Sequence, residues 1–77
     1  MSYFLLVYDR STGKLRELTE FDDADREAAL AERFARERDT EGDPNLEIVL
    51  LGAPSEEALR RTHSRYFKTA REQLSSI

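Results

Sequence analysis

The sequence contains no cysteine and only one histidine, and these two scarcities exclude several kinds of site. Without cysteine the chain forms no disulfide and offers no thiolate to a metal ion. A single histidine leaves zinc only carboxylates as further ligands, which is a poor set. We therefore expect no metal and no cofactor. The absence of cysteine also fits a reducing compartment.

Long apolar runs are missing as well. The apolar run nearest the N-terminus, residues 4–8, is too short for the core of a signal peptide and has no basic region before it. No stretch approaches the ~20 apolar residues of a membrane-spanning helix. From these features we expect a soluble, cytoplasmic protein that does not bind membranes.

The short motifs that mark common active sites are also absent. The sequence contains no glycine-rich phosphate loop, nucleophile elbow, HExxH pair or EF-hand loop. Asp22, Asp23 and Asp25 form an acidic cluster, but they stand where first-turn acids stabilise the positive end of a helix dipole. We interpret them as helix-capping residues rather than as a cation site.

Three segments have the composition of β-strands. Residues 2–8 are apolar on both alternating faces, which is typical of a central strand that is covered on both sides. Residues 14–21 follow a turn-rich segment and are predicted to be an edge strand, paired to the first as a hairpin, with a short helical turn as the alternative. The apolar residues of this segment do not alternate cleanly: Leu15, Leu18 and Phe21. Residues 46–53 form the third predicted strand.

Two segments have the pattern of amphipathic helices. The first covers residues 22–39 and begins at a cap formed by Asp22 or Asp23. Its predicted inward face consists of four apolar residues: Leu30, Ala31, Phe34 and Ala35. The second predicted helix covers residues 56–74, with Ser55 as its N-cap.

The order β-β-α-β-α predicts a single α+β domain over residues 1–77. A hairpin followed by a right-handed crossover places the third strand beside the first, so the predicted three-stranded sheet has the order 2-1-3. We expect a two-layer sandwich of this sheet with two helices. Because both faces of the sheet are apolar, either the helices flank opposite faces or a second copy covers the open face. A chain this small buries only about 60% of its unfolded surface, and we therefore expect a homodimer.

The predicted C-terminal helix concentrates positive charge in an acidic protein. Residues 58–77 contain five basic residues and one acid, although the whole chain has a net charge of −4. The basic residues share the side of the helix opposite its apolar stripe: Arg60, Arg61, Arg65, Lys68 and Arg71. We interpret this side as a solvated or self-complementing face, and alternatively as a docking surface for phosphate or an acidic protein. Because residues 1–57 carry a net charge of −8, we do not expect nucleic-acid binding.

His63 lies on the apolar stripe of the same helix, three residues before Tyr66. We interpret His63 as a packed histidine whose ring is hydrogen bonded within the protein. The alternative is a candidate pocket in which His63 and Tyr66 contact a ligand or act as a general base and its neighbour. A histidine alone is not a catalytic site, because acid–base chemistry also requires substrate geometry and an orienting partner.

These observations favour a small non-enzymatic interaction or regulatory protein that acts as a homodimer and binds a protein partner. The first alternative is a nucleic-acid-associated regulator that uses the basic face of the C-terminal helix. The second is a small dimeric enzyme with His63 in a cleft.

Overall fold

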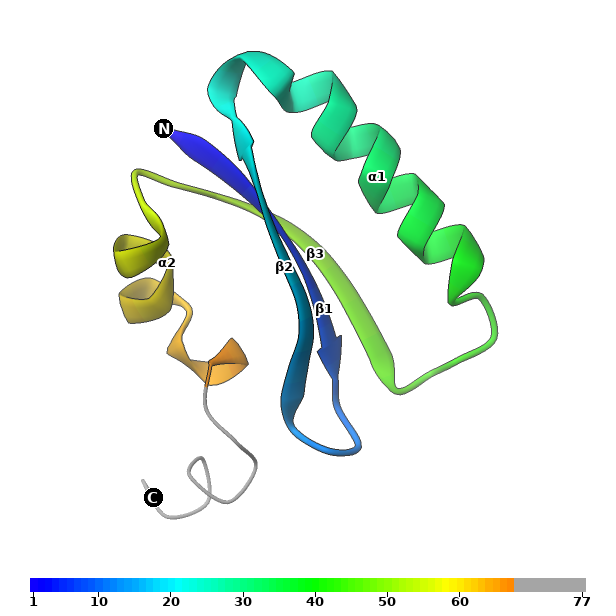
Figure 1. Cartoon of the computed structure of the whole chain (residues 1–77). Helices are drawn as coiled ribbons and strands as arrows, with labels where there is room; N and C mark the ends of the chain where they lie inside the picture. Colours follow the sequence, from blue (N-terminus) through cyan, green and yellow to red (C-terminus); the bar gives the residue numbers. More distant parts are fainter. Residues whose placement is uncertain (68–77) are drawn as a thin grey trace.

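The structure of the chain is a computed structural model that describes residues 1–67. Its strands are β1 (Ser2–Asp9), β2 (Lys14–Asp22) and β3 (Leu46–Ala53), and its helices are α1 (Arg26–Asp39) and α2 (Glu56–Thr62) (Figure 1). Short 3₁₀ turns follow β2 and α2, at Asp23–Asp25 and Ser64–Tyr66.

The strand β1 lies in the middle of a three-stranded antiparallel sheet with the order β2-β1-β3. The predicted α+β class, element order and sheet order are therefore confirmed. The central place of β1 follows from its apolar side chains on both faces, because Phe4, Leu5 and Leu6 are at most 1% exposed. An edge strand would leave such side chains partly in water.

The two helices lie on opposite faces of the sheet (Figure 1). On the α2 side, Phe4, Leu6 and Tyr8 of β1 pack with Leu59 of α2 and Tyr66 of the following turn. The alternate side chains of β1 point to the side of α1, where Ala29 is fully buried. Of the two arrangements that the sequence allows, the structure has the one with helices on both faces. The layers are therefore helix, sheet and helix, where the sequence predicted two layers.

The hairpin between β1 and β2 is held by Asp9 at the end of β1. Its Oδ1 accepts hydrogen bonds from the Ser11 N–H at 2.9 Å and the Ser11 hydroxyl at 2.6 Å. The hydroxyl bond outweighs burial and lowers the pKa of Asp9 below its usual value. Gly13 closes the turn with a φ of 70°, a conformation that favours glycine, and its N–H donates to the Asp9 carbonyl at 2.8 Å.

A β-bulge explains why the apolar residues of β2 do not alternate. Leu15 lies opposite Tyr8 whereas Glu17 lies opposite Val7, so Arg16 is an extra residue in β2. Because of this extra residue, Leu15 and Leu18 both face α2 although they are three positions apart. Beyond the bulge the register is regular, and Phe21, opposite Tyr3, faces α1.

The helix α1 differs from its prediction in its start and in its rotation. It begins at Arg26, after the 3₁₀ turn. Asp22 makes no side-chain cap and Asp23 lies inside the 3₁₀ turn, so the predicted N-cap at Asp22 or Asp23 is wrong, and Asp25, which precedes α1, makes no side-chain cap either. Ala29 is the buried residue, whereas Phe34 of the predicted inward face is 63% exposed. The small side chain of Ala29 lets the helix backbone approach the sheet closely, and on the same side the Arg36 guanidinium binds Glu17 of β2 at 2.8 Å.

The N-cap of α2 is confirmed, since the Ser55 hydroxyl accepts a hydrogen bond from the Ala58 N–H at 3.1 Å. The predicted length is wrong, because α2 ends at Thr62. His63 leaves the helical conformation, with φ −123° and ψ 47°, and a 3₁₀ turn follows. The rest of the predicted helix, residues 68–74, lies outside the described residues.

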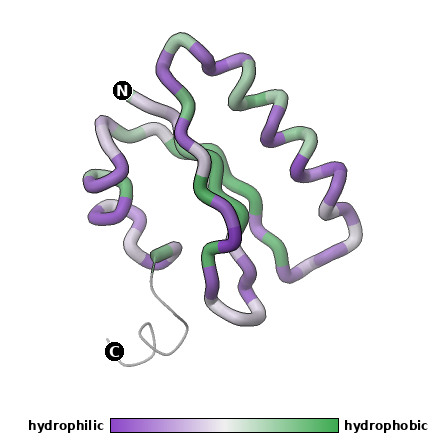
Figure 2. The backbone as a smooth tube through the Cα atoms, in the orientation of Figure 1, coloured by the Kyte–Doolittle hydropathy of each residue, from purple (hydrophilic) through white to green (hydrophobic). Residues whose placement is uncertain are grey.

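Hydrophobic residues concentrate in the middle of the sheet, whereas α2 is mostly hydrophilic (Figure 2). Within residues 1–67, no helix is both long enough and apolar enough to cross a membrane.

Candidate functional site

A cluster of polar and aromatic side chains gathers around Glu47 on the α2 side of the sheet. Glu47 lies on β3 opposite Tyr8, and its side chain is only 14% exposed. Its carboxylate accepts hydrogen bonds from Arg10 at 3.0 Å, from Arg65 at 2.6 Å and from the Tyr66 hydroxyl. We call Tyr8, Arg10, Glu47, Arg65 and Tyr66 the Glu47 cluster.

Ring contacts complete the Glu47 cluster. The rings of Tyr8 and Tyr66 meet edge to face, with centroids 5.3 Å apart and planes at 86°. The guanidinium of Arg65 lies over the Tyr66 ring at 4.1 Å and over the Tyr8 ring at 5.7 Å. The cluster therefore ties the segment after α2 to both β1 and β3.

The electrostatics of the Glu47 cluster keep its carboxylate ionised. Burial opposes ionisation of Glu47, but hydrogen bonds from Tyr66 and Arg10 and the charge of Arg65 outweigh it, so the pKa lies below its usual value. Burial, together with the hydrogen bond to Glu47, raises the pKa of Tyr66. Both carboxylate oxygens already accept hydrogen bonds, and a carboxylate with a lowered pKa is a weak base. These properties suit a structural cluster better than a catalytic one.

The basic residues predicted to share one helix face are placed separately. Arg60 pairs with Glu56 at 3.0 Å and lies 4.5 Å from the centre of the Phe67 ring. Arg61 lies 4.0 Å from Glu57, while Arg65 belongs to the Glu47 cluster. Because α2 ends at Thr62, Arg61 and Arg65 do not lie on one continuous helix. Lys68 and Arg71 lie outside the described residues.

His63 and Tyr66 take different positions after α2. His63 is half-buried, and its N–H donates to the Leu59 carbonyl at 2.8 Å. Its own carbonyl accepts from the Tyr66 N–H at 3.2 Å, while the Tyr66 hydroxyl reaches Glu47. The pocket that the sequence suggested for this pair stays a prediction.

A hollow of about 460 Å³ lies on the opposite face, where the C-terminal end of α1 meets the sheet. It is lined by Val7, Arg16, Glu17, Arg36, Asp39, Thr40 and Leu46. Its arginines are engaged with acids, since Arg36 binds Glu17 at 2.8 Å and Arg16 binds Asp9 at 3.2 Å. The hollow therefore presents paired charges of both signs rather than donors that converge on one ligand.

The two edges of the sheet differ sharply in charge. The strand β2 has a bulge and five charged residues, features that discourage pairing with another strand: Lys14, Arg16, Glu17, Glu20 and Asp22. The strand β3 has eight residues, no proline, a regular register and one charged residue, Glu47. We call the outer side of Leu46–Ala53 the β3 edge. This edge was not predicted from the sequence as an interaction site, although the near absence of charge in residues 46–53 was a visible signal.

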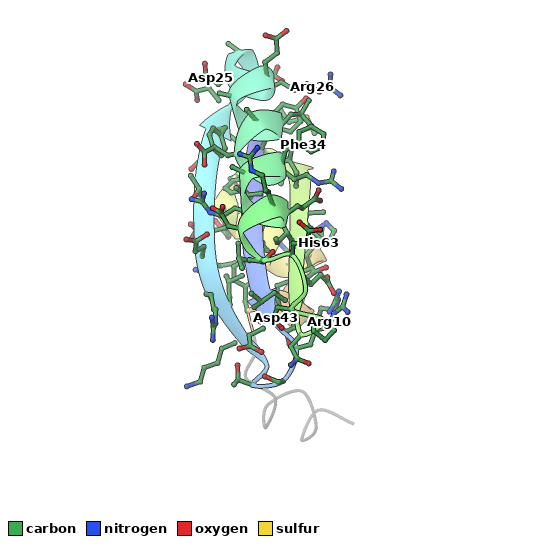
Figure 3. The ribbon with its side chains drawn as sticks, turned by 90° about the vertical axis from the view of Figure 1, so that its right-hand side faces the viewer. Arg10, Asp25, Arg26, Phe34, Asp43 and His63 are labelled. Carbon is green, nitrogen blue, oxygen red and sulfur yellow. The ribbon has the colours of Figure 1, made fainter. Side chains whose placement is uncertain are left out.

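An exposed aromatic residue lies beside the β3 edge. Phe34 projects from α1 on the side of β3 (Figure 3). The helical spacing supports this placement of Phe34. Arg36 and Asp39 line the same hollow as Arg16 and Glu17 of β2, so they lie on the flank of α1 nearer β2. Leu30 and Phe34 therefore lie on the opposite flank of the helix. Together these residues extend the apolar character of the β3 edge onto α1.

No group of three or more histidine, cysteine or acidic residues in the described part of the chain could hold a metal ion. No protein-family model matches the chain, and no curated protein or solved structure gives a match.

Proposed function

We propose that this chain is a small non-enzymatic interaction protein whose working form is a homodimer. The observation that carries the proposal is the contrast between the two sheet edges. The edge at β2 is charged and bulged, whereas the β3 edge is long, regular and nearly uncharged. An uncharged edge of this length is a template for another strand, and monomeric proteins usually protect such edges.

The described polar groups favour this function over the two alternatives. Arg60, Arg61 and Arg65 each lie within ion-pair distance of an acid of the same chain, which reduces the positive charge they offer to a phosphate backbone. The Glu47 cluster satisfies its own donors and acceptors, so it supports packing rather than turnover of a substrate. The charged fraction of 36% and the absence of cysteine are compatible with the cytoplasm. We therefore include a cytoplasmic location in the proposal.

Light scattering coupled to size exclusion tests the proposal. We expect a mass of twice the 8.9 kDa of one chain at micromolar concentration. Because the proposed contact is apolar, the mass should change little between low and high salt, unlike an assembly held by surface charges. A mass of one chain at every concentration tested would show that the proposal is wrong.

A further inference from the structure

The direction of the backbone groups on β3 follows from its pairing with β1. The Arg10 N–H donates to the Asn45 carbonyl at 2.7 Å, and this pair continues the register of the two strands. In an antiparallel ladder hydrogen-bonded pairs alternate with non-hydrogen-bonded ones. The odd-numbered residues of β3 therefore bond to β1, and four residues direct their N–H and C=O groups outwards: Leu46, Ile48, Leu50 and Gly52.

These outward groups form a row that lacks a neighbouring strand within residues 1–67, because β3 ends the sheet. The N–H of Leu46 is directed to the Asp43 carbonyl at 3.4 Å, just before the strand begins. The N–H groups of Ile48, Leu50 and Gly52 point to the outside. A strand that docks on the β3 edge would bond to this row.

Resting on the homodimer proposed above, we propose that the second copy docks its own β3 antiparallel to β3 and joins the two sheets into one six-stranded sheet. The row of outward groups is self-complementary, since the same alternate residues face outwards in both copies. A two-fold axis perpendicular to the sheet then pairs outward residues with outward residues and keeps both α1 helices on one face.

The register centred on Val49 pairs all four outward residues of one copy with outward residues of the other. With Val49 opposite Val49 of the partner subunit, Ile48 faces Leu50 and Leu46 faces Gly52, so each outward residue meets another. With Leu50 on the axis instead, Leu46 would face Pro54, which has no N–H to donate. The Val49 register therefore forms the longer ladder.

The charges near the β3 edge are compatible with a second copy. Every copy of this chain carries a net charge of −4, so two copies meet favourably only where the contact is neutral. The single charged side chain of β3, Glu47, is paired with Arg10 and Arg65 of its own chain, so it leaves no uncompensated negative charge at the edge. On the adjoining helix, Arg33 and Glu37 pair at 3.1 Å and add no net charge.

The exposed flank of α1 is explained by the same arrangement. We call the line along which the two β3 strands meet the β3 seam. The two-fold axis places the two α1 helices on the same face, each with Leu30 and Phe34 on the flank towards the β3 seam. Below them lie Ile48 and Leu50, which are half-buried on the α1 side of β3. A specific interface usually buries ~800 Å² per partner. A strand edge alone buries a small area, and contact between the flanks of the two α1 helices increases the buried area.

A single cysteine tests the register directly because the parent chain has none. The pair Val49 with Val49 of the partner subunit is of the non-hydrogen-bonded type, with Cα atoms ~4.5 Å apart, which a disulfide can span. We expect Val49→Cys to form a covalent dimer under mild oxidation. The matched control is Thr19→Cys, an exposed position in the middle of the other edge strand, which should remain uncrosslinked.

A second variant tests the flank of α1 without disturbing the core. Phe34→Glu replaces a side chain that is already 63% exposed, so the monomer should stay folded while the seam gains two like charges. We expect the mass to fall twofold, to that of one chain. Ala28→Glu, exposed on the same helix but six residues before Phe34 and therefore about 120° around the helix from it, should leave the dimer intact. Circular dichroism confirms folding of each variant.

The outcomes separate this inference from the proposed function. Cross-linking of Val49→Cys but not of Thr19→Cys, together with dissociation of Phe34→Glu, supports the β3 seam. A dimeric parent that neither cross-links through Val49→Cys nor dissociates on Phe34→Glu overturns the seam and leaves the homodimer standing. A monomeric parent overturns both.

Discussion

Glu47 is the residue at which three separate parts of the chain meet. It stands alone as a charge in an apolar strand, a position where an unpaired carboxylate would be costly. Its partners are Arg10 at the end of β1 and Arg65 and Tyr66 beyond α2. These partners lie 18 to 37 residues away, so no local pattern reveals them. The cluster holds the segment after α2 against the sheet.

Replacing this carboxylate should lower stability in a way that depends on pH. At neutral pH we expect Glu47→Gln to unfold more easily by roughly 1–2 kcal/mol, because the variant cannot form hydrogen bonds to a charged group. The folded pKa of Glu47 lies below the unfolded value of ~4.3. Its contribution is therefore fully present above that value and is lost as the pH falls through the folded pKa. Urea unfolding from about pH 7 to pH 3 measures the difference from the parent, which should shrink in acid.

The matched control for this experiment is Glu32→Gln. Glu32 pairs with Arg36 at 3.1 Å on the surface of α1, with a side chain that is 47% exposed. Pairs of this kind contribute about 0.5 kcal/mol or less. If Glu47→Gln loses as much stability at pH 3 as at pH 7, or no more than the control at neutral pH, the electrostatic role of Glu47 is refuted.

At the scale of elements, the bulge in β2 sets which side chains enter the core. Without Arg16 as an extra residue, Leu15 and Leu18 would fall on opposite faces of the sheet. With it, both pack on the α2 side, against Tyr8 and Leu6. The bulge therefore places two apolar residues that are three positions apart on the same face of the sheet.

Two single-residue deletions should have unequal effects. Deleting Arg16 removes the bulge and leaves the pairs on either side in register, at the cost of its ion pair with Asp9, whose carboxylate keeps its hydrogen bonds from Ser11. Deleting Thr19 forces either Leu18 or Phe21 to the other face, since side chains alternate strictly along a strand. We expect Arg16 deletion to be mild and Thr19 deletion to be severe in urea unfolding. Equal losses would contradict the assigned register.

At the scale of the whole molecule, the basic C-terminal segment lies in an acidic protein. In the described part, Arg60 and Arg61 pair with acids of the first turn of α2, and Arg65 pairs with Glu47 of β3. Residues 1–57 carry a net charge of −8, which repels polyanions at a distance. These contacts support the interpretation that the basic residues complement acids of their own chain.

We expect no nucleic-acid binding at physiological salt. Fluorescence anisotropy with labelled duplex DNA and single-stranded RNA at ~0.15 M salt should show no change at micromolar protein, because few phosphate contacts are available. The opposite result would be sub-micromolar binding that weakens steeply with salt. In that case Arg60→Gln combined with Arg61→Gln should flatten the salt dependence by roughly one slope unit for each arginine that binds a phosphate, and the nucleic-acid alternative would replace our proposal.

The element order, the sheet order and the α2 cap were predictable because each depends on nearby residues or on general rules of chain connection. Apolar side chains on both faces of residues 2–8 require a central strand, and a hairpin with a right-handed crossover then fixes its neighbours. Ser55 caps α2 through its own first turn. Local chemistry decides such features before any distant contact forms.

Tertiary contacts decided the rest. Helical periodicity predicts an apolar side of α1 that includes Phe34, but packing against the sheet buries Ala29, places Arg36 beside Glu17 of β2 and leaves Phe34 exposed. The amphipathic pattern continues past Thr62, yet the chain leaves the helix at His63 and Tyr66 reaches Glu47. In both helices the local pattern alone does not determine the final packing, because the contacts with distant strands exist only once the sheet has formed.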